Sequence, residues 1–251
     1  MKIVCEMAKD HGGSVHAAKE MIRDAAGQGV YAVKFQAYDL NDLNKKHTNY
    51  KRNKECHLTM EQLEELKDYA DAQNVKFWCS VFSRSCIKPL SKFIKVVKVP
   101  STFLSWDSFI LDCLVHFPSV HISTGMHNRK FIKKCMSVYN PSVMFKKAIF
   151  YHCISEYPVT SGTKLDRIKD LGMKGFSYHG SDFAPICLAK VHGAEWLEVH
   201  YSAWMTRLKE IQKTLSFTNH LLYDDGKPSS EELKNLEFYK SEFKGLKKCL
   251  K

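Results

Sequence analysis

Short apolar segments alternate with amphipathic segments eight times along the first 222 residues of the chain. The apolar segments are rich in Val, Ile, Phe and Tyr, and most are apolar at consecutive positions rather than at alternate ones. This pattern is typical of parallel strands that are buried on both faces. We expect strands at residues 2–8, 31–36, 76–81, 96–100, 119–124, 147–153, 174–179 and 196–201.

The amphipathic segments between these strands predict helices. Ser14 can cap a helix that runs to about Gly27, and Thr59 with Gln62 has the sequence of a capping box for a helix to about Gln73. Further helices are expected at residues 85–93, 106–117, 128–139, 163–171, 184–192 and 204–222.

Strict alternation of strands and helices predicts a parallel sheet. Eight repeats in a chain of this length favour a closed (β/α)8 barrel, the TIM-barrel fold of the α/β class, over an open sheet. No change of composition marks a second domain, so residues 1–222 are expected to form the barrel. Residues 223–251 are polar and rich in Lys and Glu, and we expect a helical or extended tail there.

The 251 residues carry a net charge of +11, which suits nucleic acid, an acidic surface or small anionic substrates. No signature of interleaved aromatic and basic residues accompanies the lysine clusters, so nucleic acid is not an expected partner. The nine cysteines include no C-x-x-C pair, which indicates reduced thiols and a cytoplasmic protein. No signal peptide is visible and no apolar run approaches the roughly 18 residues that span a bilayer, so no membrane association is expected.

The expected strand ends are unusually polar, and barrel enzymes place their chemistry at the carboxyl ends of the strands. Three pairs, Lys34 with Gln36, Ser177 with His179, and Glu198 with His200, are two residues apart and therefore share a face of their strand. The other polar residues at or just after strand ends are Glu6, Ser80, Lys98, Ser101, Ser123, Ser155 and Tyr157.

Two kinds of chemistry follow from these residue types. Lys34 and Lys98 with nearby serine hydroxyls would bind a phosphate, and His179 with His200, on neighbouring strands, could ligate one metal ion. Taken alone, a strand lysine is usually a surface residue, a single histidine is usually a hydrogen-bonded core residue, and a strand-end serine usually caps a helix. Their joint occurrence at strand ends favours a functional site.

The same strand ends carry motifs that resemble those of the N-acetylneuraminate (sialic acid) synthases and their relatives for legionaminic and pseudaminic acids. The motifs occur in the family's order and with similar separations. They are CEMAKDHGG at 5–13, VKFQ at 33–36, KVPS at 98–101, ISTGM at 122–126, HCISEYP at 152–158, GFSYH at 175–179 and EVHY at 198–201.

The resemblance implies a synthase that condenses phosphoenolpyruvate with a sugar aldehyde resembling an N-acylmannosamine, giving a 2-keto-3-deoxy sugar acid and phosphate. It implies Glu6, His179 and His200 as catalytic residues, and the two histidines as ligands of a divalent metal, manganese first and magnesium or cobalt as alternatives. It also implies two sets of substrate-binding residues and a homodimer. The residues for phosphoenolpyruvate are Lys34, Ser80, Lys98, Ser101, Ser123 and Ser177, and those for the sugar are Gln36, Ser155 and Tyr157.

Three departures from the family pattern keep other functions open. Phe103 stands where the family usually has an acidic residue that contacts the sugar, and the family's acidic segment after His200 is missing. Residues 223–251 are too few for the family's C-terminal antifreeze-like domain, so only the barrel domain is expected. The alternatives are related phosphoenolpyruvate- or metal-dependent aldol chemistry on another acceptor, and a degenerate barrel used for binding.

Overall fold

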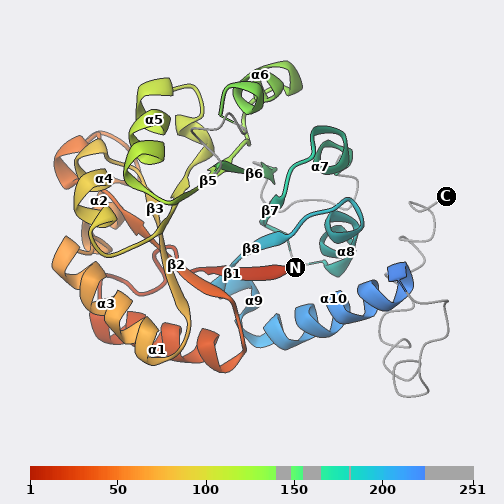
Figure 1. The fold of residues 1–251 in the computed structure, drawn as a ribbon. Helices are drawn as coiled ribbons and strands as arrows, with labels where there is room; N and C mark the ends of the chain where they lie inside the picture. The colour runs from red at the N-terminus through yellow and green to blue at the C-terminus, as the bar shows by residue number, and fades with distance from the viewer. Residues whose placement is uncertain (140–147, 155–164, 181, 224–251) are drawn as a thin grey trace.

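Eight parallel strands close into a barrel in the computed structural model, and helices surround it (Figure 1). The structure describes residues 1–139, 148–154, 165–180 and 182–223, with side chains up to residue 216 in the last helix. The strands follow one another around the barrel in chain order, and β1 closes the ring by pairing with β8. The (β/α)8 barrel expected from the sequence is therefore confirmed.

The strands and helices lie close to the ranges expected from the sequence. The strands are β1 (Lys2–Glu6), β2 (Ala32–Ala37), β3 (Lys76–Val81), β4 (Val96–Val99), β5 (Ser119–Ser123), β6 (Ala148–Cys153), β7 (Gly175–Tyr178) and β8 (Trp196–His200). The helices are α1 (Val15–Gly27), α2 (Tyr50–Glu55), α3 (Met60–Ala72), α4 (Ile87–Ser91), α5 (Asp107–His116), α6 (Arg129–Tyr139), α7 (Asp166–Leu171), α8 (Phe183–Val191), α9 (Tyr201–Trp204) and α10 (Leu208–Tyr223).

Both predicted helix caps form. The Ser14 side chain accepts a hydrogen bond from the backbone N–H of Ala17, and Thr59 and Gln62 complete a capping box at the start of α3. Each cap satisfies backbone donors that have no partner within the helix, and is typically worth about 1 kcal/mol.

Three boundaries differ from the sequence prediction. The first strand ends at Glu6 instead of residue 8, because Ala8 has a φ of 47° and leaves the extended conformation. Helix α2 was not expected, since its sequence YKRNKE has no apolar periodicity. The helix expected at 204–222 begins only at Leu208, because Tyr201–Trp204 forms the separate helix α9 and Met205–Arg207 forms a 3-10 turn.

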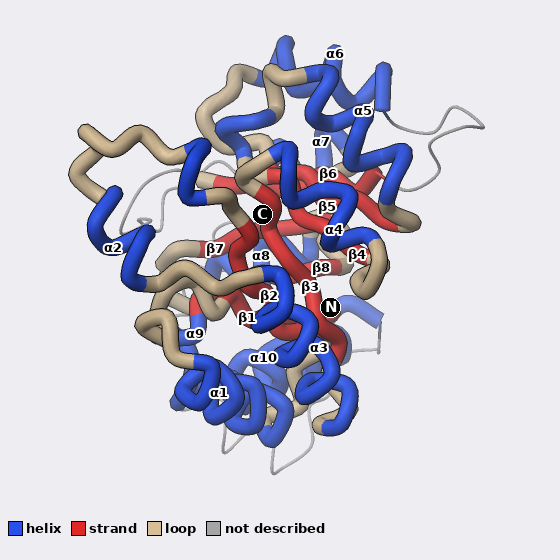
Figure 2. The backbone as a smooth tube through the Cα atoms, turned by 90° about the vertical axis from the view of Figure 1, so that its left-hand side faces the viewer, coloured by secondary structure: helices blue, strands red, loops and turns tan. Residues whose placement is uncertain are grey.

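The apolar core has two parts. The larger part fills the layer between the strands and the surrounding helices, which Figure 2 shows as a ring of helices around the central strands. The smaller part lies inside the barrel, where Val4, Ala32 and Trp78 pack with Val96 and Trp196. These residues belong to the N-terminal halves of their strands, so this end of the lumen is closed by apolar side chains.

Eight cysteines of the described residues are free thiols, as expected, and seven of them are buried. No helix in the described part of the chain is both long and apolar enough to cross a membrane. The predicted tail from residue 224 onward lies outside the described residues.

Candidate functional site

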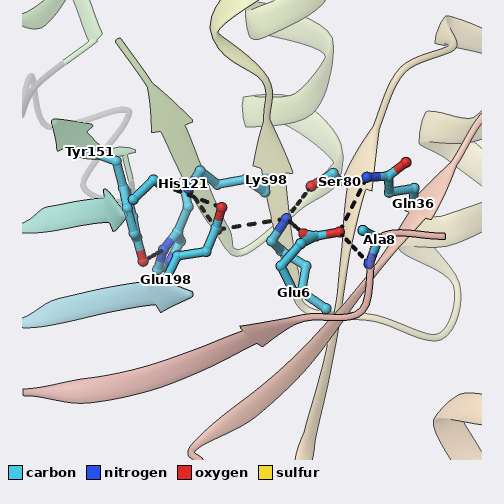
Figure 3. Close-up of polar contacts among 10 residues, drawn as sticks. Glu6, Ala8, Gln36, Ser80, Lys98, His121, Tyr151 and Glu198 are labelled. Atoms are coloured by element: carbon cyan, nitrogen blue, oxygen red, sulfur yellow. Dashed lines mark hydrogen bonds and ion pairs between the residues drawn. The ribbon is translucent and has the colours of Figure 1, made fainter. Parts of the chain in front are cut away.

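A layer of buried polar side chains lies above the apolar floor of the barrel, toward the carboxyl ends of the strands. Charged and hydroxyl groups in this layer come from strands that are far apart in the sequence, and Figure 3 shows how they face one another. Its buried members are Glu6, Lys34, Ser80, Lys98, Ser123, Ser177 and Glu198. Burial of so many charges is costly unless they are paired, so their contacts decide what the layer can do.

Lys34 on β2 lies between two carboxylates. Its Nζ forms a close ion pair with Glu6 on β1 and lies 3.6 Å from Oε2 of Glu198 on β8. The same ammonium donates to the Ser80 hydroxyl of β3 at 2.5 Å. Lys34 is only 3% exposed, so these protein groups replace the water that would otherwise surround its charge.

Lys98 on β4 reaches the same carboxylate from the other side. Its Nζ donates to Oε2 of Glu198 at 2.9 Å and to the Ser177 hydroxyl of β7 at 3.1 Å. Glu198 therefore bridges two ammonium groups that come from β2 and β4. Two carboxylates and two ammonium groups balance one another, so this charge quartet (Glu6, Lys34, Lys98 and Glu198) is electroneutral.

Three members of the quartet have shifted pKa values, and the shifts have different causes. Burial opposes the charge on Glu198, but Lys34 and Lys98 outweigh it and hold the pKa of this carboxyl well below its usual range. Burial also opposes the charge on Lys34, yet Glu198 and Glu6 raise the pKa of Lys34 above its ordinary value. At Lys98 burial prevails over the attraction of Glu198, and the pKa of this lysine is lowered.

Both oxygens of the Glu6 carboxylate are engaged. Oε1 accepts from the Ala8 backbone N–H at 2.9 Å and from the Gln36 amide at 3.2 Å, while Oε2 pairs with Lys34. The left-handed conformation of Ala8 turns its N–H back toward the end of β1, at a cost on the order of 1 kcal/mol for a residue with a Cβ. Glu6 is therefore held in one position beside Lys34.

The two predicted metal ligands lie next to each other at the ends of β7 and β8. The ring centres of His179 and His200 are 5.3 Å apart, and both side chains are half-buried. Metal–nitrogen bonds are about 2.0–2.1 Å long, so both rings can reach one ion. No third His, Cys, Asp or Glu joins them to form a larger cluster within the described residues.

The tautomer of His179 suits a ligand role. Its Nδ1 lies 3.1 Å from the Ile154 carbonyl, which can only accept, so Nδ1 carries the hydrogen and Nε2 carries the lone pair. Burial lowers the pKa of His179 despite this hydrogen bond, which favours the neutral form that binds metals.

Comparisons with known proteins decide the family. A model of the NeuB family matches residues 21–222. The chain belongs to the NeuB family. The resemblance found in the sequence motifs is thereby confirmed, although the first motif, at residues 5–13, precedes the matched range.

Individual relatives of this NeuB-family chain are distant. An uncharacterized protein of Methanocaldococcus jannaschii is 26% identical, with 93% of this chain and 69% of that protein covered. An N,N'-diacetyllegionaminic acid synthase of Legionella pneumophila is 25% identical with the same coverage. The crystal structure of an N-acetylneuraminic acid synthetase from Leptospira borgpetersenii, in complex with citrate, has a TM-score of 0.80 at 22% identity, covering 95% of this chain and 91% of that one. At this identity the structural match supports the fold alone.

Other residues expected at the NeuB-family site are only partly brought together. Ser123 is buried at the end of β5, and Gln36 contacts Glu6 as described. Ser101 is half-buried in a short 3-10 turn after β4, where its carbonyl contacts His127. Ser155 and Tyr157 lie outside the described residues.

Phe103 packs onto the helix layer. Its ring centre lies 4.5 Å from that of Phe109 in α5 and 6.3 Å from that of Phe82. An acidic side chain in this environment would lose hydration, so the aromatic residue is consistent with its neighbours and supplies no hydrogen bond for a sugar.

Three buried residues of this part of the barrel received no role from the sequence, although Glu198 was noted there as sharing a strand face with His200. Glu198 joins the two lysines, His121 and Tyr151 lie beneath Lys98, and all three are buried. For two of them the available signal was a spacing of two residues, because Glu198 precedes His200 and His121 precedes Ser123 by two positions on their strands. Tyr151 lies two positions before Cys153, which was not an expected site residue, so no such signal pointed to it.

Proposed function

We propose that this chain is a phosphoenolpyruvate-dependent synthase that joins phosphoenolpyruvate to the aldehyde carbon of an N-acylated sugar. The observation that carries the proposal is the buried charge quartet with its two serine hydroxyls, directly beside the two adjacent imidazoles. Membership of the NeuB family and the names of the relatives agree with it.

The polar layer has the donors that a small phosphorylated carboxylic acid requires. Lys34, Lys98, Ser80 and Ser177 supply ammonium and hydroxyl groups, which form short hydrogen bonds with phosphate and carboxylate oxygens. Because Glu6 and Glu198 balance the lysines, the pocket is stable before an anion arrives. The entering anion would then share the ammonium donors with the two carboxylates.

The reaction forms one carbon–carbon bond and releases one phosphate. C3 of phosphoenolpyruvate attacks the aldehyde carbon, water adds at C2, and phosphate leaves to give a 2-keto-3-deoxy sugar acid. Glu6, fixed by Ala8, Gln36 and Lys34, would keep the Lys34 ammonium oriented toward the anion while the charge moves to the leaving phosphate.

The two imidazoles fit a divalent cation, and His179 and His200 would hold it. Imidazole nitrogens bind several divalent ions, and the family resemblance favours manganese among them, with magnesium or cobalt as alternatives. A bound cation of this kind polarises a carbonyl oxygen, which suits an aldehyde acceptor.

We expect manganese and phosphoenolpyruvate each to raise the melting temperature of the purified chain. A ligand at one hundred times its Kd adds about 2.7 kcal/mol, or roughly 5–10 °C for a domain of this size. His200→Ala should lose the manganese shift and Lys98→Ala the phosphoenolpyruvate shift, whereas His16→Ala, an exposed position on α1, should keep both.

Phosphate release on adding a panel of N-acyl hexosamines and simple aldoses then identifies the acceptor. Release with none of them, despite both thermal shifts, would favour a different acceptor class for the same chemistry. Absence of both shifts in the wild-type chain would contradict the proposal and favour a barrel used for binding.

A further inference from the structure

Aromatic side chains fill the lumen directly beneath Lys98. The His121 ring lies 4.4 Å from that of Trp78 and 5.0 Å from that of Trp196, measured between ring centres. Tyr151 lies beside His121 at 5.4 Å, and Figure 3 shows both rings at the side of the quartet that Lys98 and Glu198 occupy. His121 therefore connects Tyr151 to Trp78 and Trp196 of the apolar floor.

Tyr151 is fixed on several sides. Its hydroxyl is hydrogen-bonded to Nδ1 of His121 at 2.8 Å, and its carbonyl accepts from the backbone and the hydroxyl of Thr124 at 3.1 and 2.9 Å. A Cβ at Gly175 on the adjacent strand would come within 2.4 Å of the tyrosine ring, so the absence of a side chain there makes room for it. The ring has little freedom to move.

The face of this ring is turned toward the Lys98 ammonium. Nζ lies 3.5 Å from the ring centre, well inside the roughly 6 Å limit of a cation–π contact. Tyr151 pairs with Gly175, whereas Ser177, which accepts from the same ammonium, lies two residues further toward the carboxyl end of β7. The ring therefore covers one face of the ammonium, while Ser177 and Glu198 accept hydrogen bonds from it.

We propose that Tyr151, held by His121, is a positioning residue that fixes the Lys98 ammonium through the face of its ring and thereby sets the affinity of the site for phosphoenolpyruvate. The inference rests on the proposed function, because it assigns Lys98 to the anion. It explains why a lysine that has lost its hydration keeps a defined position: Glu198, Ser177 and the negative face of the ring surround it.

The other groups around Lys98 stabilise its charge only in part, so the contact with Tyr151 matters. Burial and the like charge of Lys34 lower the pKa of Lys98, and Glu198 offsets them only in part. His121 adds no further positive charge, since burial and the neighbouring lysine hold its pKa well below the usual value. Cys153 and Tyr151, which also lie near this ammonium, remain protonated because burial raises the pKa of each, and burial lowers the pKa of the nearby His179.

The experiment varies the electron density of the ring while its shape stays nearly constant. Phenylalanine, its mono-, di- and trifluoro derivatives and leucine would be introduced at position 151 of the full chain. Binding of phosphoenolpyruvate, and separately of inorganic phosphate, would be measured by calorimetry below the melting temperature of every variant. We expect Tyr151→Phe to stay within about threefold of wild type, each added fluorine to weaken binding further, and Tyr151→Leu to weaken it between about threefold and thirtyfold.

Turnover gives a second readout. The KM for phosphoenolpyruvate should rise along the fluorine series while the KM for the sugar stays constant. Tyr139, another buried tyrosine whose hydroxyl contacts Asp107 at 2.5 Å, provides the matched control. Tyr139→Phe and Tyr139→Leu should lower the melting temperature without changing phosphoenolpyruvate affinity.

Three results would overturn the inference. If the affinity for phosphoenolpyruvate did not change with fluorination, the face of the ring would not contribute to binding, even if Tyr151→Leu failed to fold. Equal losses in Tyr151→Phe and Tyr151→Leu would assign the effect to the hydroxyl. A wild-type chain that binds neither phosphoenolpyruvate nor phosphate would refute the proposed function itself, and the inference would fall with it.

Discussion

His152 is a buried histidine whose pKa is set by its surroundings. It lies on β6, next to Tyr151, and its side chain points away from the lumen onto Phe176, whose ring is stacked on it at 6.1 Å. It is 3% exposed, and neither ring nitrogen has a hydrogen-bond partner within the described part of the chain. Burial, with the charge of Arg167, lowers the pKa of this histidine to about 4.

This residue should make the protein sensitive to mild acid. The pKa in the unfolded chain is near 6.5, so below that pH the unfolded state takes up a proton that the folded state resists down to about pH 4. We expect a loss of about 3 kcal/mol of unfolding free energy across this window. His152→Phe should be about as stable as wild type at pH 7 and lack this part of the pH dependence. Urea unfolding at several pH values measures this. If the unfolding free energy fell equally with pH in wild type and His152→Phe, the assignment would be contradicted.

At the scale of single residues, the sequence predicted which polar side chains lie at the strand ends but not what they contact. Lys34 and Lys98 were predicted from their strand positions, and both are buried in the polar layer. That Glu198 holds them together could not be read from the sequence, because β2, β4 and β8 meet only when the barrel closes.

The loop between β1 and α1 contains two adjacent glycines with different surroundings. Gly12 and Gly13 both have positive φ angles, 57° and 83°. A Cβ at Gly13 would come within 2.2 Å of the Glu55 backbone oxygen at the end of α2, whereas a Cβ at Gly12 would meet nothing within 4 Å. Gly13 therefore allows the loop after β1 to approach α2 closely, next to the strand that carries Glu6.

The two glycines form a matched pair. Gly12→Ala should cost roughly 1–2 kcal/mol from the left-handed conformation alone. Gly13→Ala should cost more and also raise the KM for phosphoenolpyruvate, because relief of the clash must shift either α2 or the loop that carries the Ala8 N–H bonded to Glu6. Thermal unfolding and steady-state kinetics of both variants test this. Equal destabilisation in the two would show that contact with α2 is unimportant.

Helices with an apolar stripe and a cap were predicted well, and elements without one were missed. The boundaries of α1 and α3 follow from Ser14 and Thr59, whose side chains act within their own turn. Helix α2 has no buried residue, so no hydrophobic periodicity could announce it. Its place is decided by tertiary contacts such as those of Tyr38, whose hydroxyl donates to the Asn53 carbonyl at 2.6 Å.

At the scale of the whole molecule, the charge quartet links strands β1, β2, β4 and β8 through the interior. The ends of the barrel differ accordingly. The site lies at the carboxyl ends of the strands, while a cavity of about 580 Å³ at the other end is lined by residues such as Lys2, Tyr31 and Lys76 and includes none of the quartet. Because the quartet joins four strands through the interior, loss of one of its members should affect the stability of the entire barrel.

Glu198→Gln tests this directly. Removing one partner of a buried ion pair typically costs about 3–5 kcal/mol, since the remaining charges stay buried and uncompensated. Glu195→Gln is the control: Glu195 pairs with Lys174 at 2.9 Å on the surface, where such pairs contribute about 0–1 kcal/mol. Urea unfolding at pH 7 should separate the two variants. Similar small losses in both would mean that the quartet tolerates an uncharged amide.

The sequence by itself determined the order of strands and helices, the closed barrel and the family, because hydrophobic periodicity, helix caps and short motifs act over a few neighbouring residues. It also determined which strand ends carry lysine, serine and histidine. Only the tertiary structure decided the partners: Glu198 between two lysines, Tyr151 beneath one of them, and the two imidazoles side by side. The reason is geometric, since those contacts join residues as far apart along the chain as Lys34 and Glu198 and exist only after closure of the barrel.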